Sequence, residues 1–399
     1  MIYLDYNATT PVDPQVFEAM RPYFTELFGN AASSNHSFGQ AAQAAVVQAR
    51  NQVAALLNVE QDERQGAREI IWTSGATESN NLAIKGVAHA YRDKGRHLIT
   101  QATEHKAVLD PFQRLESEGF EITWLPVNSA GRVSPEELSR KIRPDTLLVS
   151  IMYANNETGT IQPVREIGAI CKERNVFFHT DATQAVGKIP VDIEADGIDL
   201  LSLSAHKLYG PKGCGALFVR RKGPRVRLMP LFDGGGHERG YRSGTLNVPG
   251  IVGLGAACEI ARERMPAESQ RLSALRDRLE STIRSAVDRV VVNGDIAHRL
   301  PQVSNLSFAA AAGSSILNAL DDVAVSSGSA CTSASLQASH VLRAMGLEDE
   351  LAYNSIRFSL GRFTTPDEIE YVAAKVIRIV RSLRGITGAP DCSVSCATS

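Results

Sequence analysis

The stretch IDLLSLSAHKLYG, residues 198–210, joins a short apolar run directly to a histidine and a lysine. Its leucines fall on both faces of an extended chain, which is typical of a strand buried on both sides in a parallel sheet. Open α/β sheets bind their ligands at the carboxyl ends of the strands. The stretch therefore predicts an α/β fold in which His206 and Lys207 lie at the edge where a ligand binds.

Six further runs of the chain share this apolar, strand-like character. They comprise residues 68–74, 96–101, 121–127, 146–154, 175–182 and 215–220. Between them, segments 81–95 and 164–175 place apolar residues at helical spacing, and Gly95 is a helix stop signal. This alternation of strand and helix predicts a mainly parallel sheet of seven strands packed between helices.

The pattern changes near Gly253. The remaining chain contains predicted helices at residues 253–265, 272–287 and 367–383, and predicted short strands at residues 303–309 and 322–327. These segments indicate a second, smaller α+β unit.

We accordingly expect a large domain at residues 16–259 and a small domain formed by residues 1–15 and 260–385. Residues 326–335 would form a mobile loop of the small domain. Residues 386–399 are small and polar, which is typical of a flexible tail.

The composition is that of an ordinary globular protein, with 43% hydrophobic and 22% charged residues among 399. The net charge of −2 provides no strong field for nucleic acid or an anionic membrane, so we expect neither as a partner. No apolar run is long enough to span a bilayer. The start, MIYLDYNATTP, lacks the pattern of a signal peptide, and we expect a cytoplasmic protein.

Three predicted strand ends carry groups that suit one cofactor. Lys207 follows the strand quoted first, where desolvation favours the neutral, nucleophilic amine that forms Schiff bases. Asp181 ends the strand in FFHTDATQAVG, where a carboxylate keeps a pyridine nitrogen protonated. In TSGATESNN a strand breaks at Ser74–Gly75 and a helix begins near Thr77, which creates an anion site. Together these groups predict a pyridoxal 5'-phosphate site.

Each residue also has a simpler explanation when it is considered alone. Lys207 and Arg357 are consistent with ordinary surface side chains, Asp181 with a cap or turn residue, and Thr77 with a plain helix N-cap. His105 in TEHKAVLD is either a structural histidine or a group that stacks on a cofactor and moves protons. Arg357 in IRFSLGR has the planar fork that suits an α-carboxylate.

The six cysteines are dispersed along the chain, which does not indicate a disulfide framework. Cys392 and Cys396 are either tail thiols without a role or a metal or redox pair. Cys331 lies in SSGSACTSAS, a stretch with the composition of a loop and nothing that packs a core. A cysteine that only packs belongs on an apolar face, so the residues alone leave the role of Cys331 open.

Several stretches together form a specific pattern. They are YLDYNATTPVDP, TSGATESNNLAIKG, TEHKAVLD, ANNETG, HTDATQAVGK, SAHKLYGPKG, GGGHERGYRSGT, SSGSACTSASL and RFSLGRFTTPDEIE. Over nearly its whole length the chain resembles the cysteine desulfurases of the NifS/IscS type, in the class V branch of fold-type I pyridoxal-phosphate enzymes. The resemblance implies conversion of L-cysteine to L-alanine, with transfer of the sulfur.

The resemblance also implies roles for the residues at matching positions. The implied cofactor-binding residues are Ala76, Thr77, Ser204 and His206 for the phosphate, Asp181 for the pyridine nitrogen, Gln184 for the ring hydroxyl, His105 stacked on the ring, Asn156 beside it, and Lys207 as the covalent attachment. Arg357 and Asn156 would bind the substrate. Cys331, Lys207 and His105 would be catalytic, with Cys331 taking up the sulfur as a persulfide.

The resemblance implies a homodimer, because Thr245 of RSGT would reach the phosphate in the neighbouring subunit. It implies no resident metal, although Cys331 could ligate a transferred iron–sulfur cluster. The expected partner is a sulfur-acceptor protein such as an iron–sulfur scaffold, and the acceptor stays open between NifS-like and IscS-like types. An aminotransferase, a selenocysteine lyase and a non-catalytic assembly component are the alternative functions.

Overall fold

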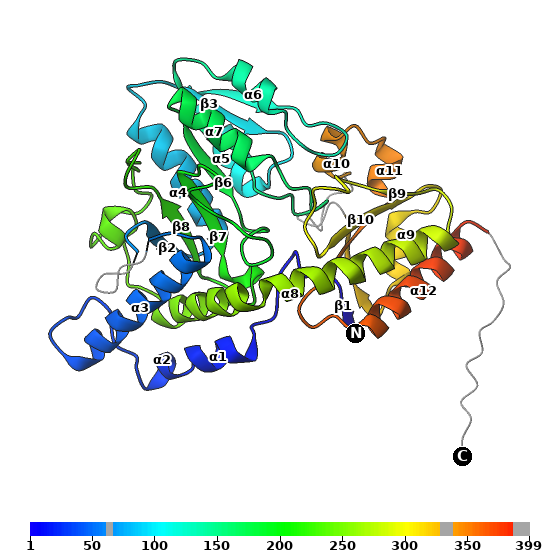
Figure 1. Ribbon diagram of the computed structural model, residues 1–399, viewed down its shortest axis with the longest axis horizontal. Helices are drawn as coiled ribbons and strands as arrows, with labels where there is room; N and C mark the ends of the chain where they lie inside the picture. Colours follow the sequence, from blue (N-terminus) through cyan, green and yellow to red (C-terminus); the bar gives the residue numbers. More distant parts are fainter. Residues whose placement is uncertain (61–66, 328–337, 386–399) are drawn as a thin grey trace.

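The computed structural model describes residues 1–60, 67–327 and 338–385, and a seven-stranded sheet forms its centre (Figure 1). In spatial order the strands are β2 (Ile70–Thr73), β8 (Gly215–Val219), β7 (Leu200–Ser204), β6 (Phe177–Asp181), β5 (Thr146–Ser150), β3 (His97–Gln101) and β4 (Glu121–Leu125). Only β8 runs antiparallel to its neighbours in this sheet. The carboxyl ends of the other strands therefore meet at one edge.

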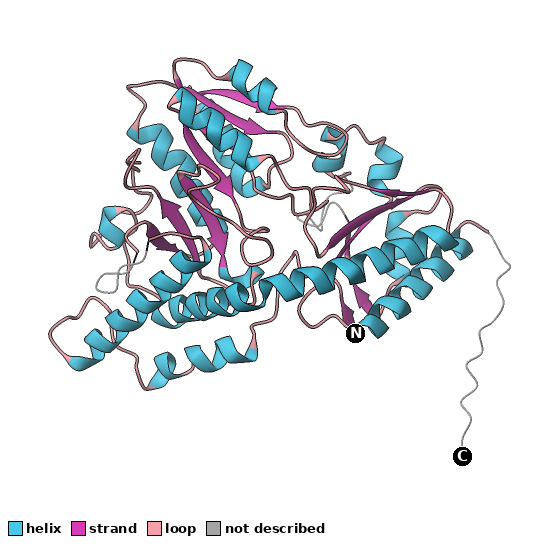
Figure 2. Ribbon diagram, in the orientation of Figure 1, coloured by secondary structure: helices cyan, strands magenta, loops and turns pink. Residues whose placement is uncertain are grey.

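Helices cover both faces of this sheet because its strands are apolar on both sides (Figure 2). One face packs against α4 (Ala76–Ala90) and α5 (Lys106–Ser117), and the other against α3 (Ser37–Leu56) and α7 (Val164–Arg174). Neighbouring residues alternate between the two cores, as Leu200 and Leu201 of β7 do. The predicted mainly parallel seven-stranded sheet is thus confirmed.

A second, smaller core lies at the far end of the molecule. Its four-stranded sheet has the order β12 (Ser326–Ser327), β13 (Ser355–Ser359), β10 (Val303–Phe308) and β9 (Val290–Val292). Helices α9 (Gly313–Ala319) and α12 (Pro366–Leu383) pack on it. Leu4 joins this core from the N-terminal segment, next to strand β1 (Ile2–Tyr3), which pairs with β11 (Val323–Ala324). The predicted α+β unit is therefore present.

The two helices predicted after Gly253 are one helix, α8 (Val248–Ala286), which crosses the lower half of the molecule in Figure 1, above α1 and α2. Its first half packs against the large core through Leu254, and its second half packs against the small core through Leu279. The polar stretch around Pro266 bridges the two cores and is exposed. The apolar periodicity lapses there because neither core covers the bridge, so the prediction of two helices was wrong.

The other elements are short and connect or flank these cores. They are α1 (Pro14–Met20), α2 (Pro22–Thr25), α6 (Pro135–Lys141), α10 (His340–Ala344), α11 (Asp349–Tyr353) and the 3₁₀ turns η1 (Ala205–Lys207) and η2 (Glu238–Gly240). No helix in the described ranges has the length and apolarity to cross a membrane. Cys331, Cys392 and Cys396 lie outside the described residues, as do most of the predicted loop and the predicted tail.

Candidate active site

A cavity of about 630 Å³ opens at the edge where the parallel strands end. Its size is within the range of small-molecule sites, roughly 300–1,000 Å³. The predicted site residues that line it are Ala76, Thr77, His105, Asn156, Asp181, Gln184, Ser204, His206, Lys207 and Arg357. Segments far apart in the sequence therefore bring together one set of polar groups.

The first turn of α4 and the end of β7 form one wall of the cavity. The helix begins at Ala76 and its N-cap is Gly75, so Thr77 lies inside the first turn and is not the cap. A Cβ atom built on Gly75 would lie 3.6 Å from Ser204 Oγ, which places the helix N-terminus beside that hydroxyl. Backbone N–H groups, the helix dipole and a hydroxyl at one point suit a phosphate group.

Two histidines near this cavity are held in the neutral form. Burial, with the positive charges of Lys207 and Lys212, lowers the pKa of His206 to about 4. Its Nδ1 lies 3.1 Å from Thr9 Oγ1. His179, two residues before Asp181 on β6, lies between the hydroxyls of Ser150 and Ser202, and burial lowers its pKa well below the usual range.

Asp181 lies at the carboxyl end of β6 and is buried. Its Oδ2 accepts a hydrogen bond from Asn80 Nδ2 at 2.7 Å, and its Oδ1 accepts one from the backbone N–H of Thr183 at 3.0 Å. These neutral donors orient the carboxylate without cancelling its charge. The negative charge therefore remains available to a cationic ring nitrogen.

Lys207 follows β7 within the turn η1, as the sequence predicts. Its Nζ donates to the backbone oxygens of Asn7 and Ala8, each at 2.6 Å. These carbonyls belong to the N-terminal segment, and Asn7 and Ala8 line the cavity together with Lys207.

His105 is the N-cap of α5, and its Nδ1 accepts the backbone N–H of Ala107 at 3.0 Å. Because Nδ1 is an acceptor, the proton of the neutral ring is on Nε2. Burial lowers the pKa of His105, and the Lys207 ammonium lowers it further against the opposing charge of Asp181. The ring is therefore neutral at neutral pH and is able to exchange protons through Nε2.

Arg357 comes from β13 of the small core and is almost fully buried at the cavity. One Nη atom donates to the backbone oxygen of Asn156 at 3.0 Å and the other donates to Asp5 Oδ1 at 2.7 Å. The backbone oxygen of Asn156 also accepts a hydrogen bond from Asn7 Nδ2 at 3.0 Å, so Asn156 is held from two sides. Both Arg357 and Asn156 are thus held in place at the cavity.

Comparison of the chain with known proteins identifies its family. Residues 2–372 match the family model described as "Aminotransferase class-V". The chain belongs to the class-V aminotransferase family. Its resemblance to the cysteine desulfurases of this family, predicted from the sequence, is confirmed by the relatives.

Cysteine desulfurase IscS of Anaeromyxobacter sp. (strain K) is 57% identical over 383 residues, covering 96% of this chain and 93% of that protein. The human cysteine desulfurase is 54% identical over 383 residues, with coverage of 96% and 82%. A solved structure described as a NifS-like protein superposes with a TM-score of 0.87 at 39% identity, covering 96% of this chain and 99% of that one.

Class-V enzymes depend on pyridoxal phosphate, and the residues present fit this cofactor. The first turn of α4 with Ser204 fits its phosphate, Asp181 fits its ring nitrogen, and Lys207 fits its aldehyde. Bound there, the cofactor would supply an electron sink for substrate carbanions.

Three residues in or beside the cavity have no role in the prediction from the sequence. Asn7 holds Lys207 through its carbonyl and is itself reached by Gln302 Nε2 at 3.3 Å. Glu157 is fully buried, which raises the pKa of its carboxyl to about 7, and it accepts a 2.5 Å hydrogen bond from Ser339 Oγ. Ser339 follows the segment that carries Cys331, so this bond anchors the chain just beyond it.

The structure does not bring Thr245 into this cavity. It is exposed in the loop between η2 and α8 and does not line this cavity.

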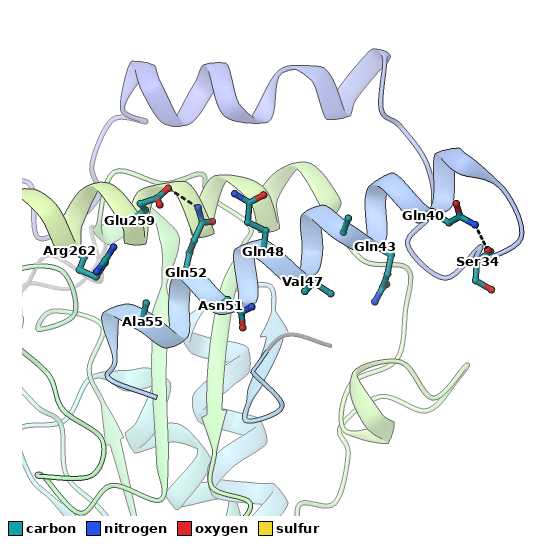
Figure 3. A pocket seen from close by; sticks show the side chains of 11 residues that line it. Ser34, Gln40, Gln43, Val47, Gln48, Asn51, Gln52, Ala55, Glu259 and Arg262 are labelled. Carbon is teal, nitrogen blue, oxygen red and sulfur yellow. Dashed lines mark hydrogen bonds between the residues drawn. The ribbon is translucent and has the colours of Figure 1, made fainter. Parts of the chain in front are cut away.

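A second cavity of about 660 Å³ lies between α3 and α8 (Figure 3). Its lining is rich in amides, and Gln52 Nε2 donates to Glu259 Oε2 across it at 2.8 Å. No lysine, histidine or aspartate occurs among the described residues that line it. It lacks the groups that class-V chemistry needs, so we assign the active site to the cavity at the strand ends.

Proposed function

We propose that this protein is a pyridoxal-phosphate-dependent cysteine desulfurase that converts L-cysteine to L-alanine and places the sulfur on Cys331. The proposal rests on one observation: Lys207, Asp181 and His105 line the same cavity, and Arg357 lines it with them. The relatives named as cysteine desulfurases support it, as does a solved structure titled "SspA in complex with cysteine" (TM-score 0.80, 39% identity, 92% and 100% coverage).

In this reaction Arg357 binds the carboxylate of L-cysteine and Asn156 borders the bound substrate. Lys207 Nζ would hold the cofactor covalently and, as a free amine, would remove the α-proton of the substrate. His105 returns protons through Nε2. Asp181, Gln184, Ala76, Thr77, Ser204 and His206 hold the cofactor, as the family pattern implies.

The Cys331 thiolate attacks the substrate sulfur. A new S–S bond forms as the C–S bond breaks, and the electron pair of that bond remains with the substrate carbon. Protonation of this carbon gives the methyl group of alanine. Cys331 lies outside the described residues, so its position in the site is part of the proposal.

The three cysteines that the structure describes are poor candidates for the nucleophile, which supports the assignment of that role to Cys331. Cys171, Cys214 and Cys258 are all buried. Burial raises the pKa of the Cys214 thiol to about 12 and raises the pKa values of the other two thiols strongly. A nucleophilic cysteine needs a thiolate, which these environments disfavour.

We propose that the enzyme acts as a homodimer in which Thr245 contacts the phosphate of the neighbouring subunit. Supporting this, Thr245 is exposed, and large apolar side chains gather on the arm formed by α1, α2 and the start of α3. Phe24 and Phe28 remain 60% and 65% exposed there. Exposed apolar groups of this kind mark interaction surfaces.

We further propose a cytoplasmic protein that passes the sulfur to an acceptor protein such as an iron–sulfur scaffold. The IscS name of close relatives supports an acceptor of this class. A transferred iron–sulfur cluster ligated by Cys331 stays part of this proposal.

The direct test is a product assay on the purified protein loaded with pyridoxal phosphate. With L-cysteine and a thiol reductant, we expect alanine and sulfide in equal amounts, without any added keto acid. An aminotransferase would instead require a keto acid and release one from its substrate. Formation of a keto acid from L-cysteine in place of alanine would contradict the desulfurase assignment.

A further inference from the structure

A second lysine lies behind the cavity, four residues after Gln184 in the turn that follows β6. Lys188 Nζ donates to Gln184 Oε1 at 3.2 Å. Gln184 lines the cavity, and its Nε2 donates to the backbone oxygen of Asn7 at 3.0 Å. That same carbonyl accepts from Lys207 Nζ at 2.6 Å. A continuous set of hydrogen bonds therefore runs from Lys188 through Gln184 to the catalytic lysine.

These contacts determine which way the Gln184 amide faces. A backbone carbonyl only accepts hydrogen bonds and an ammonium only donates them. The amide oxygen must therefore face Lys188, and the amide nitrogen must face Asn7 and the cavity. The nitrogen carries two N–H bonds, of which Asn7 takes one. The other is a donor for a ligand in the cavity.

We propose that Lys188 is a positioning residue that holds Gln184 with its amide N–H toward the ring oxygen of the cofactor. The inference rests on the proposed function, because Gln184 is there assigned to that oxygen. A donor at this point stabilises negative charge on the ring oxygen, so it lowers the affinity of the neighbouring nitrogen for its proton. Lys188 thus acts on the cofactor through Gln184 and touches neither cofactor nor substrate.

The charged groups that influence the pKa of Lys188 are Lys207 and Arg357, and both are positive. Burial first, and then these two neighbours, lower the pKa of the Lys188 ammonium to about 7. The phosphate and ring oxygen of a bound cofactor bring negative charge to the cavity and favour the ammonium form again. Loading of the site therefore strengthens the contact that fixes Gln184.

The test uses the visible absorption of the loaded enzyme, which follows protonation at the cofactor and does not depend on turnover. Lys188→Met removes the donor to Gln184 Oε1, so that only the Asn7 carbonyl still orients the Gln184 amide. We expect the pH midpoint of the absorption change to rise by about one pH unit, the size expected for one hydrogen bond to a charged group. Lys188→Arg keeps a donor and should restore most of the shift. Lys141→Met, an exposed lysine of α6, is the matched control and should leave the midpoint unchanged.

A double-mutant comparison distinguishes an effect of Lys188 that acts through Gln184 from a direct effect of its charge on the cofactor. In a Gln184→Ala background, Lys188→Met should cause no further shift. A shift of the same size in both backgrounds, or no shift in Lys188→Met alone, would overturn the inference. Lys188→Ala serves in the same comparison if the methionine variant is unstable. If the wild-type chain binds no pyridoxal phosphate, the proposed function itself fails, which is a different result from a normal spectrum with an unmoved midpoint.

Discussion

Replacing Lys207 by alanine is expected to reduce alanine formation from L-cysteine by about 10⁴-fold, the upper end of the range for loss of a positioned acid–base group. The same side chain is the proposed covalent attachment of the cofactor and the base that takes the α-proton, so both roles are lost together. Treatment of the wild type with borohydride before denaturation should leave the cofactor on the protein. The variant should release it.

The structure indicates that this variant will fold. Lys207 Nζ donates to the backbone oxygens of Asn7 and Ala8, and both residues line the cavity, where water can replace the amine. Lys222→Ala, at an exposed lysine, is the control and should retain full activity. Retained activity and borohydride-stable cofactor in Lys207→Ala would contradict the assignment of this lysine.

Replacing Asp181 by asparagine should lower the turnover rate on the order of 100- to 1,000-fold, the effect of removing one preorganised electrostatic contact at a reacting centre. The carboxylate charge keeps the ring nitrogen protonated, and an amide does not. The rate constant for removal of the α-proton should fall, because that step depends on the electron sink. Stopped-flow absorbance with L-cysteine measures it.

Asparagine has nearly the same shape as aspartate, so Asp181→Asn should fit the site without a change of packing. Asn80 Oδ1 is buried and has no partner among the described residues, so a flip of the Asn80 amide gives the new amide an acceptor. The thermal unfolding midpoint should therefore change little. Asp93→Asn, exposed after α4, is the matched control. An unchanged rate of α-proton removal in Asp181→Asn would show that Asp181 does not serve the ring nitrogen.

The sequence predicted those parts of the site that directly follow strands. Asp181 and Lys207 each come at or just after the end of an apolar run, and the parallel sheet places such ends at one edge. The helix N-terminus after β2 was predicted for the same reason, although the cap is Gly75. Arg357 was assigned through the family resemblance, since a strand of the second core reaches the cavity only in the folded chain.

The residues that the sequence did not predict act through contacts between distant segments. Asn7 supplies a carbonyl to Lys207, 200 residues away, and Ser339 bonds to Glu157 across 182 residues. Neither contact is encoded in a local sequence pattern, so it could not be predicted from the sequence. Lys188 was missed because a lysine in a turn is ordinarily exposed, and only the folded structure shows its bond to Gln184.

The central claim is that sulfur leaves L-cysteine by way of Cys331. The most direct test is a single turnover of the pyridoxal-phosphate-loaded protein with L-cysteine and no reductant, followed by mass spectrometry of its peptides and quantification of alanine. We predict one added sulfur atom on the peptide that contains Cys331, matched by one alanine per active site, and neither product in Cys331→Ser. Alanine formed at the wild-type rate by Cys331→Ser, or sulfur added to another cysteine, would contradict the account.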